Sequence, residues 1–136
     1  VTLVFSEERS EAGIREGLEN RRTVVWHDNL LVGRPDFLLP LIDASLEVVS
    51  AGYMGNTSIL AVTIENKSDV NFMVWNRSDY SLHKNADVFL IKANDITRIE
   101  VKTLEILEGI EMNWEILNAV VAPDTHAQFD IKIAVN

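Results

Sequence analysis

The residues of this chain that could bind a metal ion or transfer protons are few and far apart. Its histidines, His27, His83 and His126, are separated by dozens of residues, and the chain contains no H-x-H pair. A short-range metal site needs a second histidine or cysteine within about four positions. With no cysteine, the chain also lacks thiolate nucleophiles, disulfides and cysteine-bound zinc. We therefore expect no catalytic residue, no cofactor-binding residue and no metal ligand in this chain.

Other catalytic patterns are equally weak. Serine, histidine and aspartate are present in sufficient number for a hydrolytic triad, but the chain has no G-x-S-x-G elbow. Its six glycines are scattered singly and do not form a phosphate-binding loop. Acidic and amide residues near predicted loops offer calcium binding as an alternative, yet none follows the D-x-[DN]-x-[DN]-G ligand order. These residues are Asp69, Asn71, Asp79, Asp87 and Asp95.

Three asparagines satisfy the N-glycosylation pattern: Asn56, Asn66 and Asn76. Each is expected at a turn or a strand end, where asparagine and serine side chains commonly bond to the local backbone. We favour this structural role over glycosylation.

The first third of the chain alternates strand and helix signals. Residues 1–5, VTLVF, form a short apolar run typical of a strand inside a sheet. Ser10 is a suitable N-cap for a helix that continues to about Asn20, with Ile14 and Leu18 on one face. Strands at 23–26 and 30–32 flank His27-Asp28-Asn29, which predicts a hairpin with His27 at its rim. A short helix over 36–43, restricted by Pro40, precedes the expected domain boundary.

From Ser45 onward the hydrophobic period becomes two, which predicts strands with one apolar face. The short links exclude crossover helices and favour an antiparallel arrangement. The expected fold is mainly β: an immunoglobulin-like antiparallel β-sandwich of about seven strands, preceded by a small α/β (strand-helix-hairpin) segment. Trp75, on the third strand, is expected to fill the core. The seven predicted strands are 46–51, 59–65, 72–75, 87–91, 99–103, 113–121 and 129–135.

Composition and charge are typical of a compact soluble domain, and they argue against binding to polyanions. The 136 residues are 47% hydrophobic, and the net charge of −9 would repel nucleic acid and anionic membrane. The densest basic cluster is Arg21-Arg22, which suits the end of a helix. No apolar run is long enough for a membrane span, so we expect no membrane insertion. Because Val1 opens directly on a strand pattern, we expect any export signal to have been removed or to lie upstream.

The N-terminal third also resembles a known family. TLVF at 2–5, ERS at 8–10 and RRTVVW at 21–26 are similar to the segment that closes the PHP (polymerase and histidinol phosphatase) metal-dependent phosphoesterase domain. The resemblance is strongest to exported PHP phosphodiesterase-like proteins of Bacteroidetes-type bacteria, in which a C-terminal immunoglobulin-like domain often follows. NKSDVNF at 66–72 and LHKNADV at 82–88 are similar to that second domain. The resemblance thus implies a PHP-type remnant over residues 1–43 and an immunoglobulin-like sandwich over residues 44–136.

This resemblance transfers no catalytic residue, because the family's metal ligands lie upstream of the segment seen here. It implies divalent metals in the missing catalytic domain and none in this chain. The implied function is a noncatalytic accessory module that packs against, or oligomerises, a PHP-type phosphoesterase domain in cis. A homo-oligomer is compatible with this function.

The alternative function is an autonomous binding module for a glycan, peptide or cell-surface partner. Localisation is expected in the periplasm or cell envelope, with the cytoplasm as the alternative. The candidate interdomain interface is Leu3, Phe5, Ile14 and Leu18.

Overall fold

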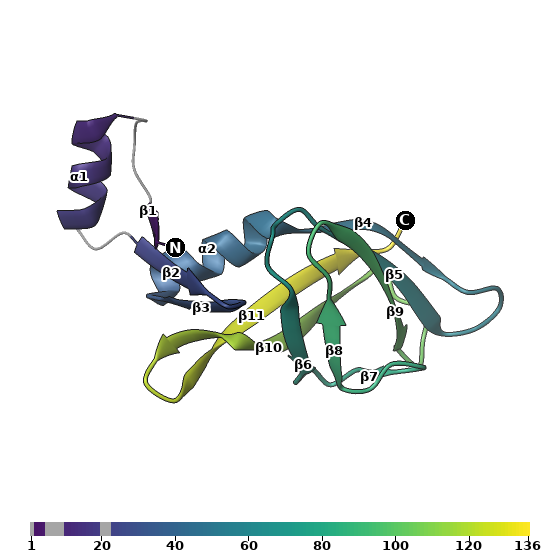
Figure 1. Cartoon of the computed structure of the whole chain (residues 1–136). Coiled ribbons are helices and arrows are strands. Elements are labelled where there is room, and N and C mark those ends of the chain that lie inside the picture. The colour runs from purple at the N-terminus through teal and green to yellow at the C-terminus, as the bar shows by residue number, and fades with distance from the viewer. Residues whose placement is uncertain (1, 5–9, 20–22) are drawn as a thin grey trace.

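The computed structural model describes residues 2–4, 10–19 and 23–136, and Figure 1 shows its elements. The N-terminal third contains a strand, a helix, a hairpin and a second helix, and the rest is made of strands and turns, as the sequence predicts. In chain order the elements are β1 (Thr2–Val4), α1 (Glu11–Glu19), β2 (Thr23–His27), β3 (Leu30–Gly33), α2 (Pro35–Ser45), β4 (Leu46–Tyr53), β5 (Ile59–Asn66), β6 (Phe72–Asn76), β7 (Ser81–Leu82), β8 (Val88–Ile91), β9 (Asp95–Lys102), β10 (Gly109–Ala122) and β11 (Thr125–Ala134).

The strands form two sheets. One has the order β1-β2-β3-β10-β6-β8, with β11 also paired to β10, and the other has the order β4-β5-β9-β7. Neighbouring strands are antiparallel except β3 and β10, which are parallel. The predicted antiparallel sandwich and its seven strands are confirmed. The sequence reading missed the two-residue β7 and the parallel pairing, because neither has a periodic signal of its own.

The core lies between the two sheets and continues under the hairpin. On β5 the predicted apolar side chains Leu60, Val62 and Ile64 are fully buried, as the period of two requires. The same hydrophobic cluster includes Val24 and Leu31 of the hairpin. It also includes Leu38 and Ile42 of α2, which packs against both the hairpin and β11. Figure 1 shows α2 running from the hairpin toward β4. The N-terminal segment and the sandwich therefore share one core.

The prediction that Trp75 fills the core is wrong. Strand β6 turns Phe72 and Val74 inward and Trp75 outward, and the indole remains 37% exposed. The Arg77 guanidinium lies over the ring of Trp75, 4.0 Å from its centroid. The core indole is instead Trp114 on β10, fully buried and edge-on to Phe89 at a centroid distance of 5.6 Å. The sequence FMVW is apolar on both faces of β6, so periodicity could not decide which face is inside.

Local signals in the N-terminal third were read correctly. The Oγ of Ser10 accepts a hydrogen bond from the backbone N–H of Gly13 at 3.0 Å, which is the predicted N-cap. Asp28 and Asn29 have φ of 47° and 65°, as a two-residue hairpin turn of type I′ requires. Helix α2 is longer than the predicted 36–43. It begins at Pro35, a favoured first helical position, and continues past Pro40 because Leu38 and Ile42 anchor it in the core.

Candidate interdomain junction

Three asparagine side chains join the hairpin to the sandwich. They are Asn29 in the hairpin turn, Asn71 before β6 and Asn118 in β10, and they lie 42 and 47 residues apart along the chain. The Nδ2 of Asn118 donates to the backbone carbonyls of Asn29 and Asn71, both at 2.7 Å. Its Oδ1 accepts from the backbone N–H of Met73 at 2.9 Å. One buried amide thus connects three segments of the chain, and we call these three asparagines the asparagine junction.

The other two asparagines complete this network. Asn29 Oδ1 accepts from the backbone N–H of Asn71 at 2.8 Å, and Asn29 Nδ2 donates to the Asn71 carbonyl at 2.9 Å. Asn71 Oδ1 in turn accepts from the backbone N–H of Ala93, after β8, at 2.8 Å. A carbonyl oxygen has two lone pairs, so the Asn71 carbonyl can accept from both partners. The junction therefore gives hydrogen-bond partners to backbone groups of the hairpin turn, of the start of β6 and of the segment after β8.

A β-bulge places Asn118 in this position. The pairing of β10 with β11 shifts register between Ile116 and Val120, so Asn118 and Ala119 are both buried in succession. At the end of this shifted stretch, Ala119 and Val120 pair with Leu31 and Val32 of β3. The bulge thus allows one strand, β10, to pair with β6 along one stretch and with the hairpin along the next. This continuity holds the hairpin in a fixed orientation on the sandwich.

The predicted interface residues are only partly described. Leu3 is half-buried and packs against the common core, on the same face of the sheet as its register partner Val24. Phe5 and the side chains of Ile14 and Leu18 lie outside the description. The four-residue interface and the boundary between residues 43 and 44 therefore stay predictions.

Two of the three glycosylation-pattern asparagines build matching turns. In N-K-S-D-V (66–70) and N-R-S-D-Y (76–80), the asparagine Nδ2 donates to the carbonyl four residues later, at 2.7 Å in both cases. Its Oδ1 accepts from the backbone N–H and the Oγ of the serine two residues later. Asn66 is fully buried and Asn76 is 7% exposed. Their predicted turn role is confirmed. Asn56 is exposed in the β4–β5 turn.

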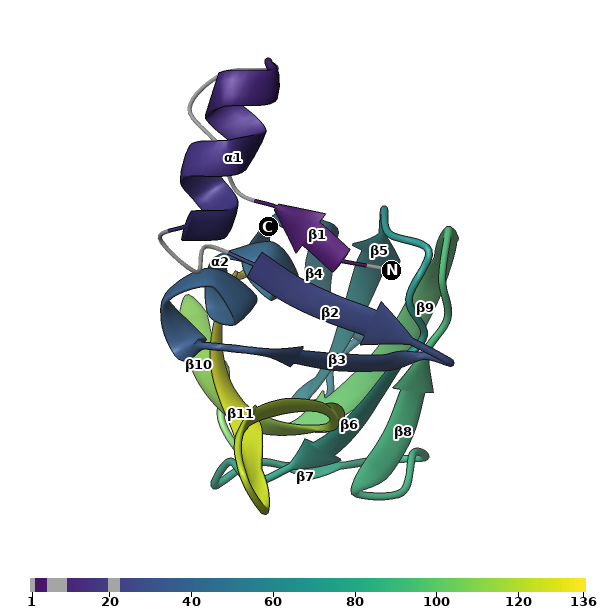
Figure 2. The same cartoon turned by 60° about the vertical axis from the view of Figure 1, so that its left-hand side comes forward.

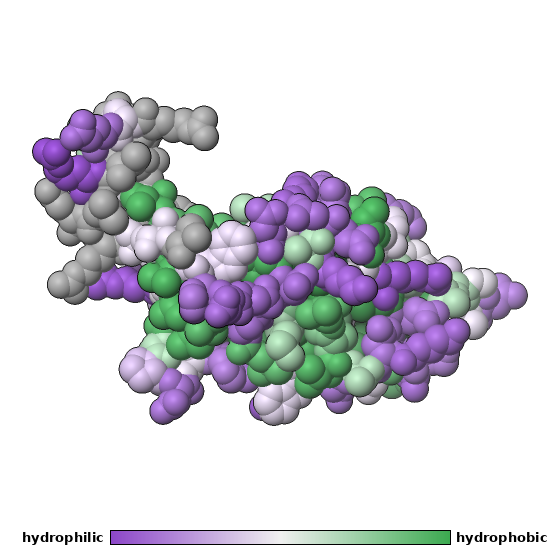
Figure 3. All heavy atoms as spheres, viewed as in Figure 1, coloured by the Kyte–Doolittle hydropathy of each residue, from purple (hydrophilic) through white to green (hydrophobic). Residues whose placement is uncertain are grey.

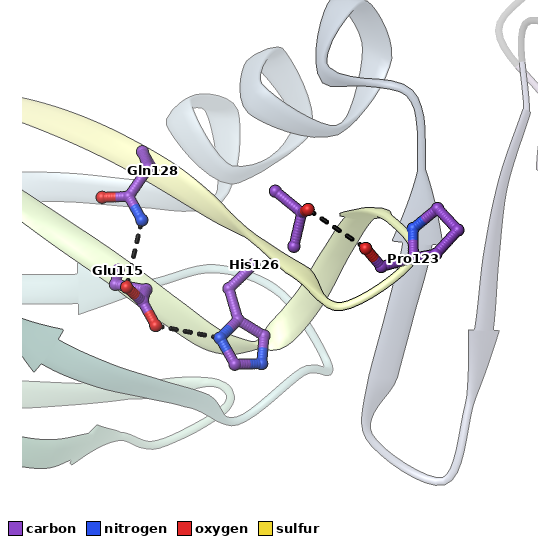
Figure 4. A network of polar contacts seen from close by, with 5 residues as sticks. Glu115, Pro123, His126 and Gln128 are labelled. Atoms are coloured by element: carbon purple, nitrogen blue, oxygen red, sulfur yellow. Dashed lines mark hydrogen bonds and ion pairs between the residues drawn. The ribbon is translucent and has the colours of Figure 1, made fainter.

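A polar cluster on the sandwich surface surrounds Glu115 (Figure 4). His126 Nδ1 lies 2.9 Å from Oε2 of Glu115, and Gln128 Nε2 donates to Oε1 at 3.1 Å. The hydrogen bond from His126, with a smaller contribution from Gln128, lowers the pKa of Glu115 below its ordinary value of 4.5. Thr125 donates to the Pro123 carbonyl at 3.2 Å in the adjoining turn. The cluster links β10 to β11.

The three histidines lie on separate elements. His27 is exposed beside Asp28, with 3.2 Å between Nε2 and Oδ2, and His83 is exposed after β7. Among the side chains that the structure describes within residues 2–4, 10–19 and 23–136, no three or more histidine, cysteine, aspartate or glutamate residues are grouped so that they could hold a metal ion. Within that same part of the chain, neither helix has the length and apolar character needed to cross a membrane.

This arrangement of strands and helices is similar to that of a protein of known structure. A crystal structure of a two-domain protein containing a predicted PHP-like metal-dependent phosphoesterase, from Bacteroides vulgatus, superposes with a TM-score of 0.82 at 28% identity. The match covers 97% of this chain and 38% of that one, so this chain spans well under half of its structural neighbour. Among curated proteins, none matches this sequence significantly.

The match to a protein family concerns the sandwich itself. A family model described as an Ig-like domain, DUF5001, matches residues 46–132, from the start of β4 almost to the end of β11. The two packed sheets and the antiparallel strand pairings agree with that description. On this evidence the chain belongs to the DUF5001 family of Ig-like domains.

Proposed function

We propose that this chain is the noncatalytic accessory part of a PHP-type metal-dependent phosphoesterase and holds the end of the catalytic domain in a fixed orientation. The observation that carries this proposal is the match to the two-domain Bacteroides protein over 97% of this chain. Because the match includes the N-terminal third as well as the sandwich, the comparison favours a unit that is retained whole beside a PHP-like domain. Divalent metals would belong to that catalytic domain.

The asparagine junction supports an orienting role. A flexible tether would need no buried contacts between the hairpin and the sandwich. Here the hairpin pairs with β10, contributes Val24 and Leu31 to the common core, and is bonded through Asn29 to Asn71 and Asn118. Because the hairpin is held on the sandwich, a domain attached to the hairpin would also have a fixed orientation relative to the sandwich.

A phosphodiesterase assay tests the proposal. The 136-residue chain and the longer native protein that contains it would each be incubated with bis-p-nitrophenyl phosphate and Mn²⁺, Mg²⁺ or Zn²⁺. We expect hydrolysis by the longer protein only, and its loss on chelation with EDTA. Comparable, EDTA-sensitive hydrolysis by the 136-residue chain would contradict an accessory role, and so would a longer protein with no metal-dependent activity.

One observation favours a second function, an autonomous binding module. Four large apolar side chains lie on the outer face of β6 and β8 and are 37–45% exposed: Met73, Trp75, Val88 and Leu90. Exposed aromatic and aliphatic side chains beside polar groups such as Glu115 are typical of ligand-binding surfaces on sandwiches. Binding of glycans or peptides by the wild type that is lost in Trp75→Ala, with folding retained, would support this function.

The compartment and the assembly are part of the same proposal. The resemblance to exported proteins supports the periplasm or cell envelope, and cell fractionation with an antibody against the sandwich would test it. A homo-oligomer would be detected by sedimentation of the longer protein over a range of concentrations.

A further inference from the structure

We propose that the outer face of the β2–β3 hairpin is the surface against which the phosphoesterase domain packs. This inference rests on the proposed function and deepens it by naming the contact. The surface consists of Val25, Leu30 and Val32, with Val120 of β10 beside them, and we call it the hairpin outer face. It shares no residue with the interface expected from the sequence.

Strand register places these side chains together. Val25 pairs with Val32, and Leu30, two residues before Val32, lies on the same face of β3. Val32 also pairs with Val120 across the parallel β3–β10 contact. Val25, Leu30 and Val32 are 44%, 41% and 40% exposed. Figure 3 shows hydrophobic surface over this part of the molecule.

The opposite face of the same hairpin is already filled. Val24 and Leu31 are fully buried in the core, where α2 covers them. Strands that are apolar on both faces are typical of sheets covered on both sides. The outer face of the hairpin also carries Thr23 and His27 at its ends, but its central pair is apolar, whereas the outer positions of sandwich strand β5 include the charged Glu65. The centre of the hairpin therefore has the composition of a strand pair inside a protein, although only one of its two faces is packed against other elements.

The position of helix α1 indicates which domain packs on the hairpin outer face. Figures 1 and 2 both show α1 standing away from the sandwich, beyond the β1 edge of the sheet that contains the hairpin. A nine-residue helix has little stability in water without tertiary packing. A domain seated at this end of the molecule would support α1 and cover the hairpin outer face together. The Bacteroides neighbour carries a PHP-like domain in addition to the part matched by this chain.

The size and charge of the surface argue against a second copy of this chain. Stable association of separate proteins buries about 800 Å² on each partner, more than a few aliphatic side chains provide. Each copy would also bring a net charge of −9. A domain joined in cis has a high effective concentration and needs a smaller contact.

Thiol labelling tests the proposal, because this chain has no cysteine of its own. Val32→Cys would place one thiol on the hairpin outer face, and Val49→Cys is the matched control, since Val49 is 50% exposed on β4 of the other sheet. Each variant is labelled with a maleimide in the 136-residue chain and in the longer native protein. Peptide mass spectrometry reads the site, so that cysteines elsewhere do not interfere.

We expect V32C to react about tenfold more slowly in the longer protein than in the 136-residue chain, because a covered thiol reacts only when the contact opens. V49C should react equally in both. Val25→Cys repeats the measurement from the paired strand in case V32C disturbs folding, which circular dichroism would reveal.

Equal reactivity of V32C and V25C in the two forms would overturn the docking surface while leaving the phosphodiesterase result intact. Protection of Met73→Cys in place of V32C would also overturn it, since the contact would then lie on β6 and β8. Protection that depends on protein concentration would assign the surface to a second copy. A longer protein without metal-dependent hydrolysis would remove the proposed function and this inference together.

Discussion

The interior of the sandwich and the asparagine junction hold the same chain together by different interactions. Between the sheets, almost every contact is apolar, with Trp114 and Phe72 among the largest fully buried side chains. At the junction, Asn29, Asn71 and Asn118 make directional hydrogen bonds between three segments. Apolar burial is non-directional and contributes mainly free energy, whereas hydrogen bonds contribute less net free energy but require one geometry.

This difference suggests that the sandwich core and the asparagine junction have separate structural roles. The sandwich core would make the domain stable, and the junction would fix the direction in which the N-terminal segment leaves it. Mutations in the core should therefore lower global stability, while mutations in the junction should change the local dynamics of the hairpin. The free energy of unfolding measures the first effect, and local hydrogen exchange measures the second.

The largest loss should follow removal of the core indole. Trp114→Ala leaves a cavity beside Phe89, and such changes cost about 3–5 kcal/mol of unfolding free energy. Urea denaturation of the 136-residue chain measures this. Trp75→Ala is the matched control and should cost less, because its ring lies on the outer face, is 37% exposed and leaves no cavity in the core; its contact with Arg77 is worth about 0.5–1 kcal/mol. Equal losses for the two tryptophans would contradict the placement of Trp114 inside and Trp75 outside.

The next loss should come from the first of the matching turns. Asn66→Ala removes the partner of the Val70 carbonyl and of Ser68, and unpaired buried polar groups cost about 1–3 kcal/mol. The free energy of unfolding, again in urea, reports it. Asn56→Ala, in the exposed β4–β5 turn, should stay within about 0.5 kcal/mol. A neutral Asn66→Ala would show that the turn is held by its backbone alone.

Removal of the junction amide should be most visible in hydrogen exchange. Asn118→Ala leaves the Met73 N–H and the Asn29 carbonyl without their side-chain partner, at a cost of about 1–2 kcal/mol. We expect faster exchange at Met73 and in the hairpin than in β5. The control on the same strand is Asn113→Ala, which loses only an exposed bond to Asp130. Uniform acceleration across both sheets would mean that the junction is ordinary core.

The smallest effect should be a pH dependence at Glu115. Its folded pKa is lowered, so the carboxylate stabilises the fold above its unfolded pKa, and this contribution is lost as the pH falls through the folded pKa below 4.5. Thermal melts of wild type and Glu115→Gln should therefore differ above pH 4.5 and converge under more acidic conditions. Differences that grow with acidification would contradict the sign of the pKa change.

Most of the fold could be predicted because its signals are local. The Ser10 cap, the Asp28-Asn29 turn and the alternation in β5 each depend on a few neighbouring residues. The side of β6 that faces inward could not be predicted, since Met73 and Val74 are both apolar. The junction was also missed: Asn29 was read as a turn residue, Asn71 as a calcium candidate and Asn118 not at all.

The sequence by itself determined the mainly β fold, the positions of the strands and turns, and the acidic surface, because these follow from side-chain period, backbone preference and charge within short segments. Only the tertiary structure decided that β3 pairs with β10, that Asn29, Asn71 and Asn118 meet, and that the hairpin keeps one apolar face exposed. Those features depend on strand order and on a bulge in β10, which bring together residues more than forty positions apart. No local preference encodes such a meeting, since it results from the packing of the whole chain.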